Sequence, residues 1–170
     1  LADGGIAAIT RKYDLPNYGV FDEKRVFTAA PLPKPLEFRG AKLGVLICED
    51  MWTPPAAKAL AEAGADFLLV MNGSPFEFDK TDVRLNLGRL RAKETGLPLA
   101  YLNLVGGQDE LVFDGDSFVI GADGELLIRM PSWSEEVVLT HWRKDKARWV
   151  CAPGEISTCP TGSEAIYRAL

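Results

Sequence analysis

Hydrophobic runs separated by helix-like segments dominate the central part of the chain. Residues 42–48 and 66–71 are nearly continuous apolar runs, typical of strands that are buried on both faces of a sheet. Between them, two prolines open a segment rich in helix formers, which is predicted to end at Gly64. A second helix is expected over residues 79–94 and a third strand over residues 98–105. The alternation of strands and helices predicts an α/β sheet.

The expected helix over residues 79–94 has a recognisable apolar side. Val83, Leu87 and Leu90 fall on one face at helical spacing. We expect the charged residues to lie elsewhere on the helix and to face solvent; they are Arg84, Arg89, Arg91 and Lys93.

The chain before residue 42 predicts little regular structure. A short strand is expected over residues 5–11, followed by a loop over residues 12–21 that contains Pro, Asn, Gly and large aromatic residues. Three alternating prolines exclude a helix over residues 30–35 and indicate an extended connector.

Hairpin patterns follow the third strand. Strands are expected over residues 110–113, 117–120 and 126–130, with an Asp-Gly turn signal before the last of them. Residues 135–142 are interpreted as an edge strand and residues 143–162 as a charged loop. The final eight residues, 163–170, predict the start of a helix.

Composition limits the classes of protein to which this chain can belong. The chain has 170 residues, of which 47% are hydrophobic and 25% charged, which excludes a disordered tail. The net charge of -5 without a basic block argues against a nucleic-acid or anionic-membrane surface, and no apolar run is long enough to span a bilayer. We expect a cytoplasmic protein. Because the first residue is Leu and no strand precedes Ile6, we interpret the chain as a fragment.

Cysteine and histidine usage limits the chemistry further. Cys48, Cys151 and Cys159 are an odd number without zinc-ligand spacing, and His141 is the single histidine. A disulfide scaffold and a structural zinc site are therefore not expected, and no metal site is predicted. A cysteine nucleophile in this chain needs a base other than histidine, because His141 lies in a segment that is interpreted as a peripheral strand end.

Cys48 is the strongest candidate for a catalytic residue in this sequence. It ends a predicted buried strand and is followed by Glu49, Asp50 and Trp52 within four residues. Ligand sites of α/β sheets lie just beyond the carboxyl ends of strands, so the position suits a nucleophile. The alternative is a buried core cysteine. Lys12 could lower a thiol pKa and stabilise an oxyanion, whereas taken alone it is interpreted as a surface lysine.

The acidic group formed by Asp109, Glu110, Asp114 and Asp116 invites comparison with a calcium loop. It lacks the spacing and the closing Glu of an EF-hand, so we interpret it as a hairpin turn with solvated acids.

Four segments together resemble a known family. Residues 11–12, 15–23, 44–52 and 72–76 are similar to the carbon-nitrogen hydrolase (nitrilase) superfamily, and within it to the glutaminase domains of glutamine-dependent NAD synthetases. The segment Leu-Pro-Asn-Tyr-Gly-Val-Phe-Asp-Glu carries the narrower resemblance, and residues 109–117 agree with it. The resemblance implies a nitrilase-like α-β-β-α sandwich of class α/β, present here in part, without its N-terminal portion.

The resemblance also implies roles for individual residues. Cys48 matches the nucleophile of a Glu-Lys-Cys triad, Lys12 matches its lysine, and the backbone N–H of Glu49 would complete the oxyanion hole. The general-base glutamate of the family lies upstream of the lysine, outside these residues. Glu23 resembles a second, supporting glutamate of the family. The alternative interpretation is that Glu23 is a solvated residue in the charged run of residues 22–25. Tyr18, Ser74 and Lys80 match residues around the amino-acid end of glutamine. The alternative is that Lys80 is a surface lysine and Ser74 a turn residue.

We therefore expect residues 1–150 to form the C-terminal two-thirds of a glutaminase domain, and residues 151–170 to form a linker and the first helix of a synthetase domain. The implied activity releases ammonia from glutamine for the ATP-dependent conversion of deamido-NAD to NAD. No cofactor is expected in these residues; ATP and Mg belong to the synthetase domain. Expected partners are glutamine, that domain and further copies of the chain. Two alternatives stay open, namely a free-standing nitrilase-type amidase and a non-catalytic assembly module.

Overall fold

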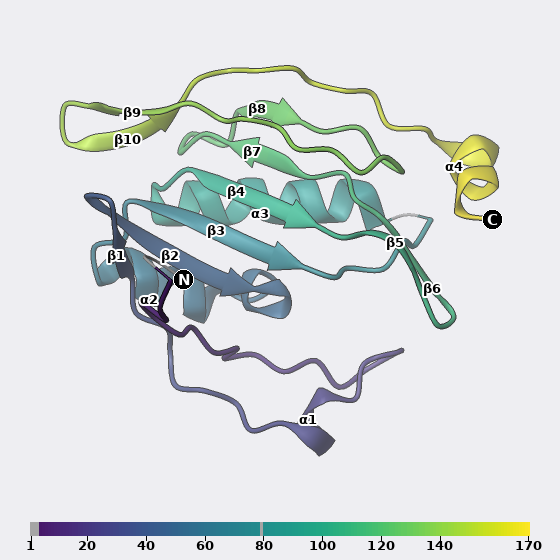
Figure 1. The fold of residues 1–170 in the computed structure, drawn as a ribbon, viewed down its shortest axis with the longest axis horizontal. Coiled ribbons are helices and arrows are strands. Elements are labelled where there is room, and N and C mark those ends of the chain that lie inside the picture. The colour runs from purple at the N-terminus through teal and green to yellow at the C-terminus, as the bar shows by residue number, and fades with distance from the viewer. Residues whose placement is uncertain (1–3, 79) are drawn as a thin grey trace.

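A six-stranded mixed sheet forms the centre of the protein (Figure 1). The structure is a computed structural model that describes residues 4–78 and 80–170, without the side chains of Lys80 and Thr81. The strands, in their order across the sheet, are β1 (Leu36–Phe38), β2 (Ala41–Ile47), β3 (Phe67–Asn72), β4 (Leu99–Asn103), β7 (Phe118–Ile120) and β8 (Leu126–Arg129). The strands β2, β3 and β4 are parallel, and their neighbours on both sides are antiparallel.

Two helices cover one face of this sheet. They are α2 (Pro54–Glu62) and α3 (Lys80–Thr95), and both lie behind the sheet in Figure 1. Pro54 begins α2, and Gly64, at φ +83°, follows its end, as the sequence predicts. The apolar core lies between helices and sheet and includes Leu46, Leu60, Leu68, Leu99 and Ile120, all fully buried. The apolar runs thus form the buried parallel strands that were predicted from them.

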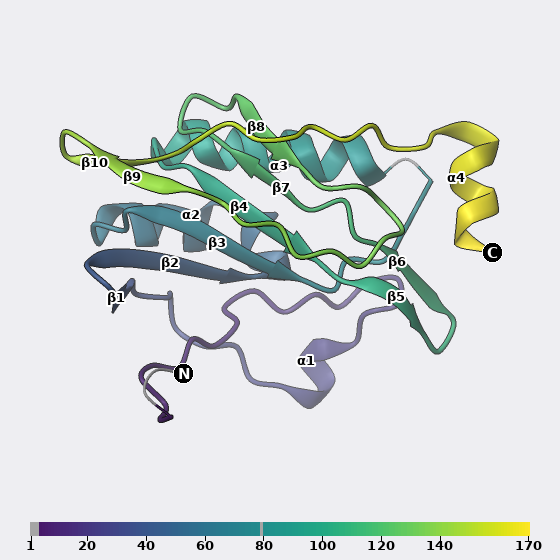
Figure 2. The ribbon, with the colours of Figure 1, turned by 45° about the horizontal axis from the view of Figure 1, so that its top comes forward.

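Two separate hairpins complete the strand inventory of the described residues. One is β5 (Val105–Gln108) with β6 (Leu111–Asp114), and the other is β9 (Trp142–Asp145) with β10 (Arg148–Cys151). The Trp142 ring stacks on Phe67 at 4.6 Å between centroids, so the second hairpin packs on the sheet face opposite the helices (Figure 2). The remaining elements are α1 (Glu23–Val26), the 3-10 helix η1 (Cys48–Met51) and α4 (Gly162–Ala169).

Two predictions about strands are wrong. Residues 6–11 form no strand, and Ile6 and Ile9 are 72% and 63% exposed, because no strand within residues 4–78 and 80–170 covers them. Residues 135–141 are also irregular, while the predicted loop over residues 143–162 contains most of the β9–β10 hairpin. The sequence does not reveal this hairpin, because its strands carry many charged side chains. A two-stranded hairpin leaves much of its surface in solvent and therefore needs no apolar run.

The buried face of α3 also differs from the prediction. Val83 and Leu90 are 42% and 45% exposed, whereas Arg84 and Arg91 are buried. Arg84 can lie inside because its guanidinium forms a two-pronged ion pair with Asp114, with Nη1 2.8 Å from Oδ1. Burial alone lowers the pKa of Arg84, but the hydrogen bonds and charge of Asp114 outweigh it and raise the pKa.

Asp114 and Asp116 are therefore not the solvated acids that were predicted; both are buried, whereas Asp109 and Glu110 are exposed. Gly115 between them has φ +72°, which turns the two carboxylates toward different partners. Asp116 accepts a hydrogen bond from Arg129 Nε at 2.7 Å. The pair of Arg84 and Asp114, in which both side chains are buried, explains why neither of them faces solvent. Arg129, which is 15% exposed, plays the same part for the buried Asp116.

The six-stranded sheet with helices on one face is the partial α/β architecture that the sequence predicts. None of the helices in this part of the chain is long and apolar enough to cross a membrane.

Candidate active site

Cys48 lies where β2 turns into η1. It has φ +49°, a left-handed conformation that is uncommon outside glycine, and its side chain is half-buried. The parallel strands β2, β3 and β4 all end on this side of the sheet, where ligand sites of α/β folds are found. A strained turn of this kind presents a side chain above the strand end rather than within the core.

Lys12 and Glu23 meet beside this turn. Lys12 Nζ lies 2.6 Å from Glu23 Oε1, and the two side chains are 14% and 25% exposed. Glu23 is the first residue of α1, and Lys12 belongs to the loop that runs along the β2 edge of the molecule (Figures 1 and 2). The structure thus brings together two residues that the sequence analysis singled out separately.

Tyr18 and Glu49 form a second pair. The Tyr18 hydroxyl lies 3.0 Å and 2.8 Å from the two carboxylate oxygens of Glu49 and donates to that group. Burial, the hydrogen bond to Glu49 and the nearby charges of Cys48 and Glu77 raise the pKa of Tyr18. Tyr18 is therefore held next to the Cys48 turn.

Ser74 is placed deeper than an exposed turn residue. It is buried after the end of β3, and its backbone N–H donates to Asn103 Oδ1 at 2.9 Å. Asn103 Nδ2 in turn donates to the Ser74 carbonyl at 3.2 Å, which fixes the segment. Lys80 begins α3, but its side chain lies outside the described residues.

A cavity of about 760 Å³ opens beside Tyr18 and Trp52. Glu77 contributes a carboxyl group to its otherwise largely apolar wall, and the segment that carries Ser74 continues into it. The other lining residues are Gly19, Val20, Phe21, Pro75, Phe76, Phe78, Val83 and Leu111. A space of this size and character can hold a small organic substrate with a few polar groups.

Sequence reasoning did not single out Asp50 as a site residue. Asp50 is fully buried in η1 and accepts hydrogen bonds from the backbone N–H groups of Tyr13, Asp14 and Ile47. Burial raises the pKa of Asp50, while these hydrogen bonds and the charge of Lys12 lower it in part. The position of an acidic residue just after a buried strand could have drawn attention to Asp50. The sequence alone does not show which backbone amides its carboxylate would accept hydrogen bonds from.

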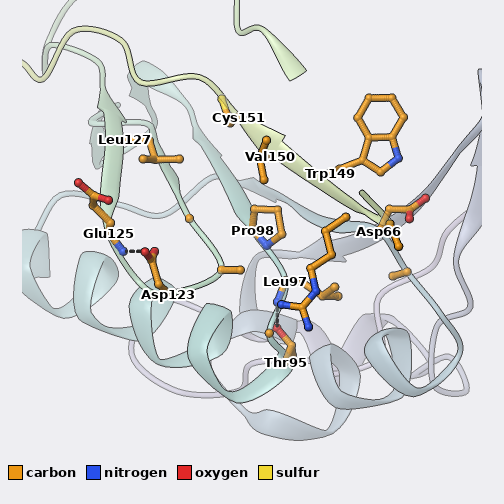
Figure 3. A pocket seen from close by; sticks show the side chains of 16 residues that line it. Asp66, Thr95, Leu97, Pro98, Asp123, Glu125, Leu127, Trp149, Val150 and Cys151 are labelled. Atoms are coloured by element: carbon orange, nitrogen blue, oxygen red, sulfur yellow. Dashed lines mark hydrogen bonds between the residues drawn. The ribbon is translucent and has the colours of Figure 1, made fainter. Parts of the chain in front are cut away.

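A second cavity, of about 700 Å³, lies at the opposite end of the sheet (Figure 3). Trp149 and Arg148 line it together with Asp66, Asp123 and Glu125, and the backbone N–H of Glu125 donates to Asp123 Oδ1 at 3.0 Å. None of the predicted site residues contributes to it. Within the described ranges, no group of three or more His, Cys, Asp or Glu side chains is arranged to hold a metal ion.

Comparison with known families gives one match over most of the chain. The Carbon-nitrogen hydrolase family profile matches residues 1–148. A glutamine-dependent NAD(+) synthetase from Rhodobacter capsulatus is 45% identical over 170 residues, which are 100% of this chain and 31% of the relative. The chain thus spans about a third of the length of this curated relative.

Solved structures agree with the sequence relatives. The glutamine-dependent NAD+ synthetase from Acinetobacter baumannii, in complex with ADP, has a TM-score of 0.91 at 37% identity, covering 99% of this chain and 32% of that one. A mutant of the amidase from Nesterenkonia sp. AN1 has a TM-score of 0.59 at 35% identity over 71% of this chain and 44% of its own. That structure shows covalent addition of the acetamide moiety of fluoroacetamide at the active site cysteine.

Proposed function

Because the chain belongs to the carbon-nitrogen hydrolase family, we propose that it forms part of an enzyme that hydrolyses the side-chain amide of glutamine, with Cys48 as the nucleophile. The observation that carries this proposal is the convergence of the strained Cys48 turn with the Lys12–Glu23 and Tyr18–Glu49 pairs at one end of β2. The covalent cysteine adduct of the related amidase supports the same role for Cys48.

The proposed reaction proceeds through a thioester. The sulfur of Cys48 bonds to the side-chain carbonyl carbon of glutamine, the carbon–nitrogen bond breaks, and the nitrogen takes up a proton and leaves as ammonia. Water then hydrolyses the thioester, which releases glutamate and restores the thiol. The Lys12 ammonium and the backbone N–H of Glu49 stabilise the oxyanion that forms in both steps.

The base of this reaction is proposed to be a glutamate upstream of Lys12, outside these 170 residues, with Glu23 in a supporting role. General acid–base catalysis contributes about 100-fold to 10,000-fold. We therefore propose that the 170 residues alone release almost no ammonia. Robust turnover by this chain alone would instead indicate a base within these residues, for which Glu23 is one candidate.

Recognition of the amino-acid end of glutamine is assigned to Tyr18, Ser74 and Lys80. Tyr18 lines the cavity of about 760 Å³, and Ser74 directly precedes Pro75, which lines it as well. Cys48 itself is not one of the lining residues. A lysine ammonium suits the α-carboxylate of the substrate as a point charge.

The NAD synthetases among the relatives support a wider proposal. Residues 1–150 belong to the glutaminase domain, and residues 151–170 lead into a synthetase domain that uses ATP and Mg. The ammonia released at Cys48 passes to that domain, where deamido-NAD becomes NAD. The enzyme is proposed to be a cytoplasmic homo-oligomer.

The test compares Cys48→Ala with Cys159→Ala in the complete gene product. Cys48→Ala is expected to abolish NAD synthesis from glutamine and to retain synthesis from ammonia, whereas Cys159→Ala retains both. Glutamine-dependent synthesis by Cys48→Ala would reject the nucleophile. Hydrolysis of other small amides, without glutamine hydrolysis by the wild-type protein, would favour a free-standing amidase.

A further inference from the structure

One buried carboxylate joins the loop of Lys12 to the turn of Cys48. Asp50 Oδ1 accepts the backbone N–H groups of Tyr13 at 3.1 Å and Asp14 at 2.7 Å, while Oδ2 accepts that of Ile47 at 3.0 Å. Tyr13 directly follows Lys12, and Ile47 directly precedes Cys48. The side chain of Asp50 therefore connects the immediate neighbours of the two residues whose separation matters for the proposed chemistry.

The segment of residues 12–30, which begins with Lys12, needs such a connection, because it contributes no strand to the sheet. Several of its backbone hydrogen bonds stay within the segment: the carbonyls of Lys12, Pro16 and Tyr18 accept from residues 30, 23 and 21, respectively. The contacts to the rest of the fold include side chains, among them the Thr53 hydroxyl, which donates to Asp14 Oδ2 at 2.9 Å. Thr53 follows Asp50 by three residues and directly precedes α2.

We propose that Asp50 is a positioning residue, whose carboxylate fixes the distance between the Lys12 ammonium and the Cys48 sulfur without itself reacting. This inference rests on the proposed glutaminase function. Asp50 is 1% exposed, so its three amide partners hold it in one orientation. Small displacements of a catalytic group reduce the rate strongly, and a misplacement of about 1 Å can cost roughly 100-fold.

The decisive variant is Asp50→Asn. An amide of the same size keeps one oxygen for Tyr13 and Asp14 but then presents its NH₂ group to the N–H of Ile47, where two donors meet. Asp66→Asn is the matched control, because Asp66 Oδ2 also accepts a backbone N–H, that of Lys42 at 2.7 Å, at the opposite end of β2.

The experiment uses the complete gene product and measures kcat and KM for glutamine, together with NAD synthesis from ammonia. Asp50→Asn is expected to lower kcat for glutamine up to about 100-fold with little change in KM, and to leave synthesis from ammonia intact. Asp66→Asn is expected to match the wild type in all three. An unchanged kcat, or an equal loss with both nitrogen sources, would overturn the proposal.

A milder variant keeps the question decidable if Asp50→Asn does not fold. Thr53→Val preserves side-chain shape and removes the hydroxyl that donates to Asp14, and this hydroxyl makes no capping hydrogen bond to α2. We expect a loss of about 2-fold to 10-fold in kcat at constant KM. In that case, an unchanged kcat would overturn the proposal. If the wild-type protein itself does not hydrolyse glutamine, the proposed function fails instead, so the two failures are distinguishable.

Discussion

Lys12 and Glu23 form an ion pair of 2.6 Å between Nζ and Oε1, although Lys12 lies in a loop and Glu23 begins the helix α1 that follows it. The pair is largely shielded from solvent, so the carboxylate holds the ammonium in one place more firmly than a surface partner would. In the proposed reaction, the same ammonium has to point at the oxyanion formed above Cys48. In that proposed reaction, the carboxylate of Glu23 would act through the position of Lys12.

Replacing Glu23 tests this relationship. Glu23→Gln keeps the shape of the side chain but removes the charge that orients Lys12, and we expect kcat for glutamine to fall by about 10-fold to 100-fold. Asp22→Asn is the control, because the neighbouring Asp22 pairs with Arg25 in an exposed position. Steady-state kinetics of the complete gene product measure the effect. Equal kinetics of the two variants would show that the charge of Glu23 does not contribute to the reaction.

The three cysteines are expected to differ in reactivity toward an electrophilic glutamine analogue. Cys159 Sγ lies 3.0 Å from Asp116 Oδ1, and burial together with this carboxylate raises the pKa of Cys159 to about 11. Burial also raises the pKa of Cys151. Since the thiolate is the reactive form, we expect Cys48 to be labelled far faster than either at neutral pH.

Peptide mapping after brief labelling of the complete gene product checks this expectation. As the pH rises toward 11, the thiolate fraction of Cys159 grows roughly tenfold per pH unit, so its labelling by a neutral alkylating reagent should rise with it. Equal labelling of all three cysteines at pH 7 would contradict the assignment of Cys48 as the nucleophile.

Lys80 is predicted to affect substrate binding rather than turnover. Contacts to the α-carboxylate act in the ground state and the transition state alike, so Lys80→Ala should chiefly raise KM for glutamine, by about 10-fold to 150-fold. Synthesis from ammonia should be unchanged. Lys58→Ala on the exposed side of α2 is the control. Unchanged glutamine kinetics of Lys80→Ala would remove the residue from the site.

The sequence predicts the parallel centre of the fold well, because each of its strands is an apolar run and each helix carries its own end signals. It fails where a residue's environment depends on a distant partner. Arg84 looks like a surface residue of α3 until Asp114, 30 residues later, is placed beside it. The segment that holds Ile6 and Ile9 has the pattern of a strand, but in the described part of the chain no other strand covers these two side chains.

The candidate site shows the same limit. Cys48 and Lys12 could be selected from local sequence and Tyr18 from the family resemblance, and the structure gathers them at one end of β2. Asp50 could not be assigned a purpose in this way, since its partners are backbone amides about 36 residues earlier, and any residue type can supply a backbone amide. Register and loop path, which no local pattern encodes, decide which amides it meets.

The Arg84–Asp114 pair yields a prediction about stability. Both side chains are almost completely buried, so Asp114→Asn leaves a buried guanidinium without its counter-charge, and we expect a loss of about 3–5 kcal/mol in the free energy of unfolding. Glu62→Gln, which breaks the exposed pair with Lys58, is the control and should change stability by less than about 0.5 kcal/mol. The double variant Arg84→Met with Asp114→Asn should be less destabilised than Asp114→Asn alone, because the unpaired charge is gone.

Urea denaturation of the complete gene product, followed by tryptophan fluorescence, measures these differences. A double variant at least as unstable as Asp114→Asn would show that packing of the arginine stem, and not its charge, accounts for the loss.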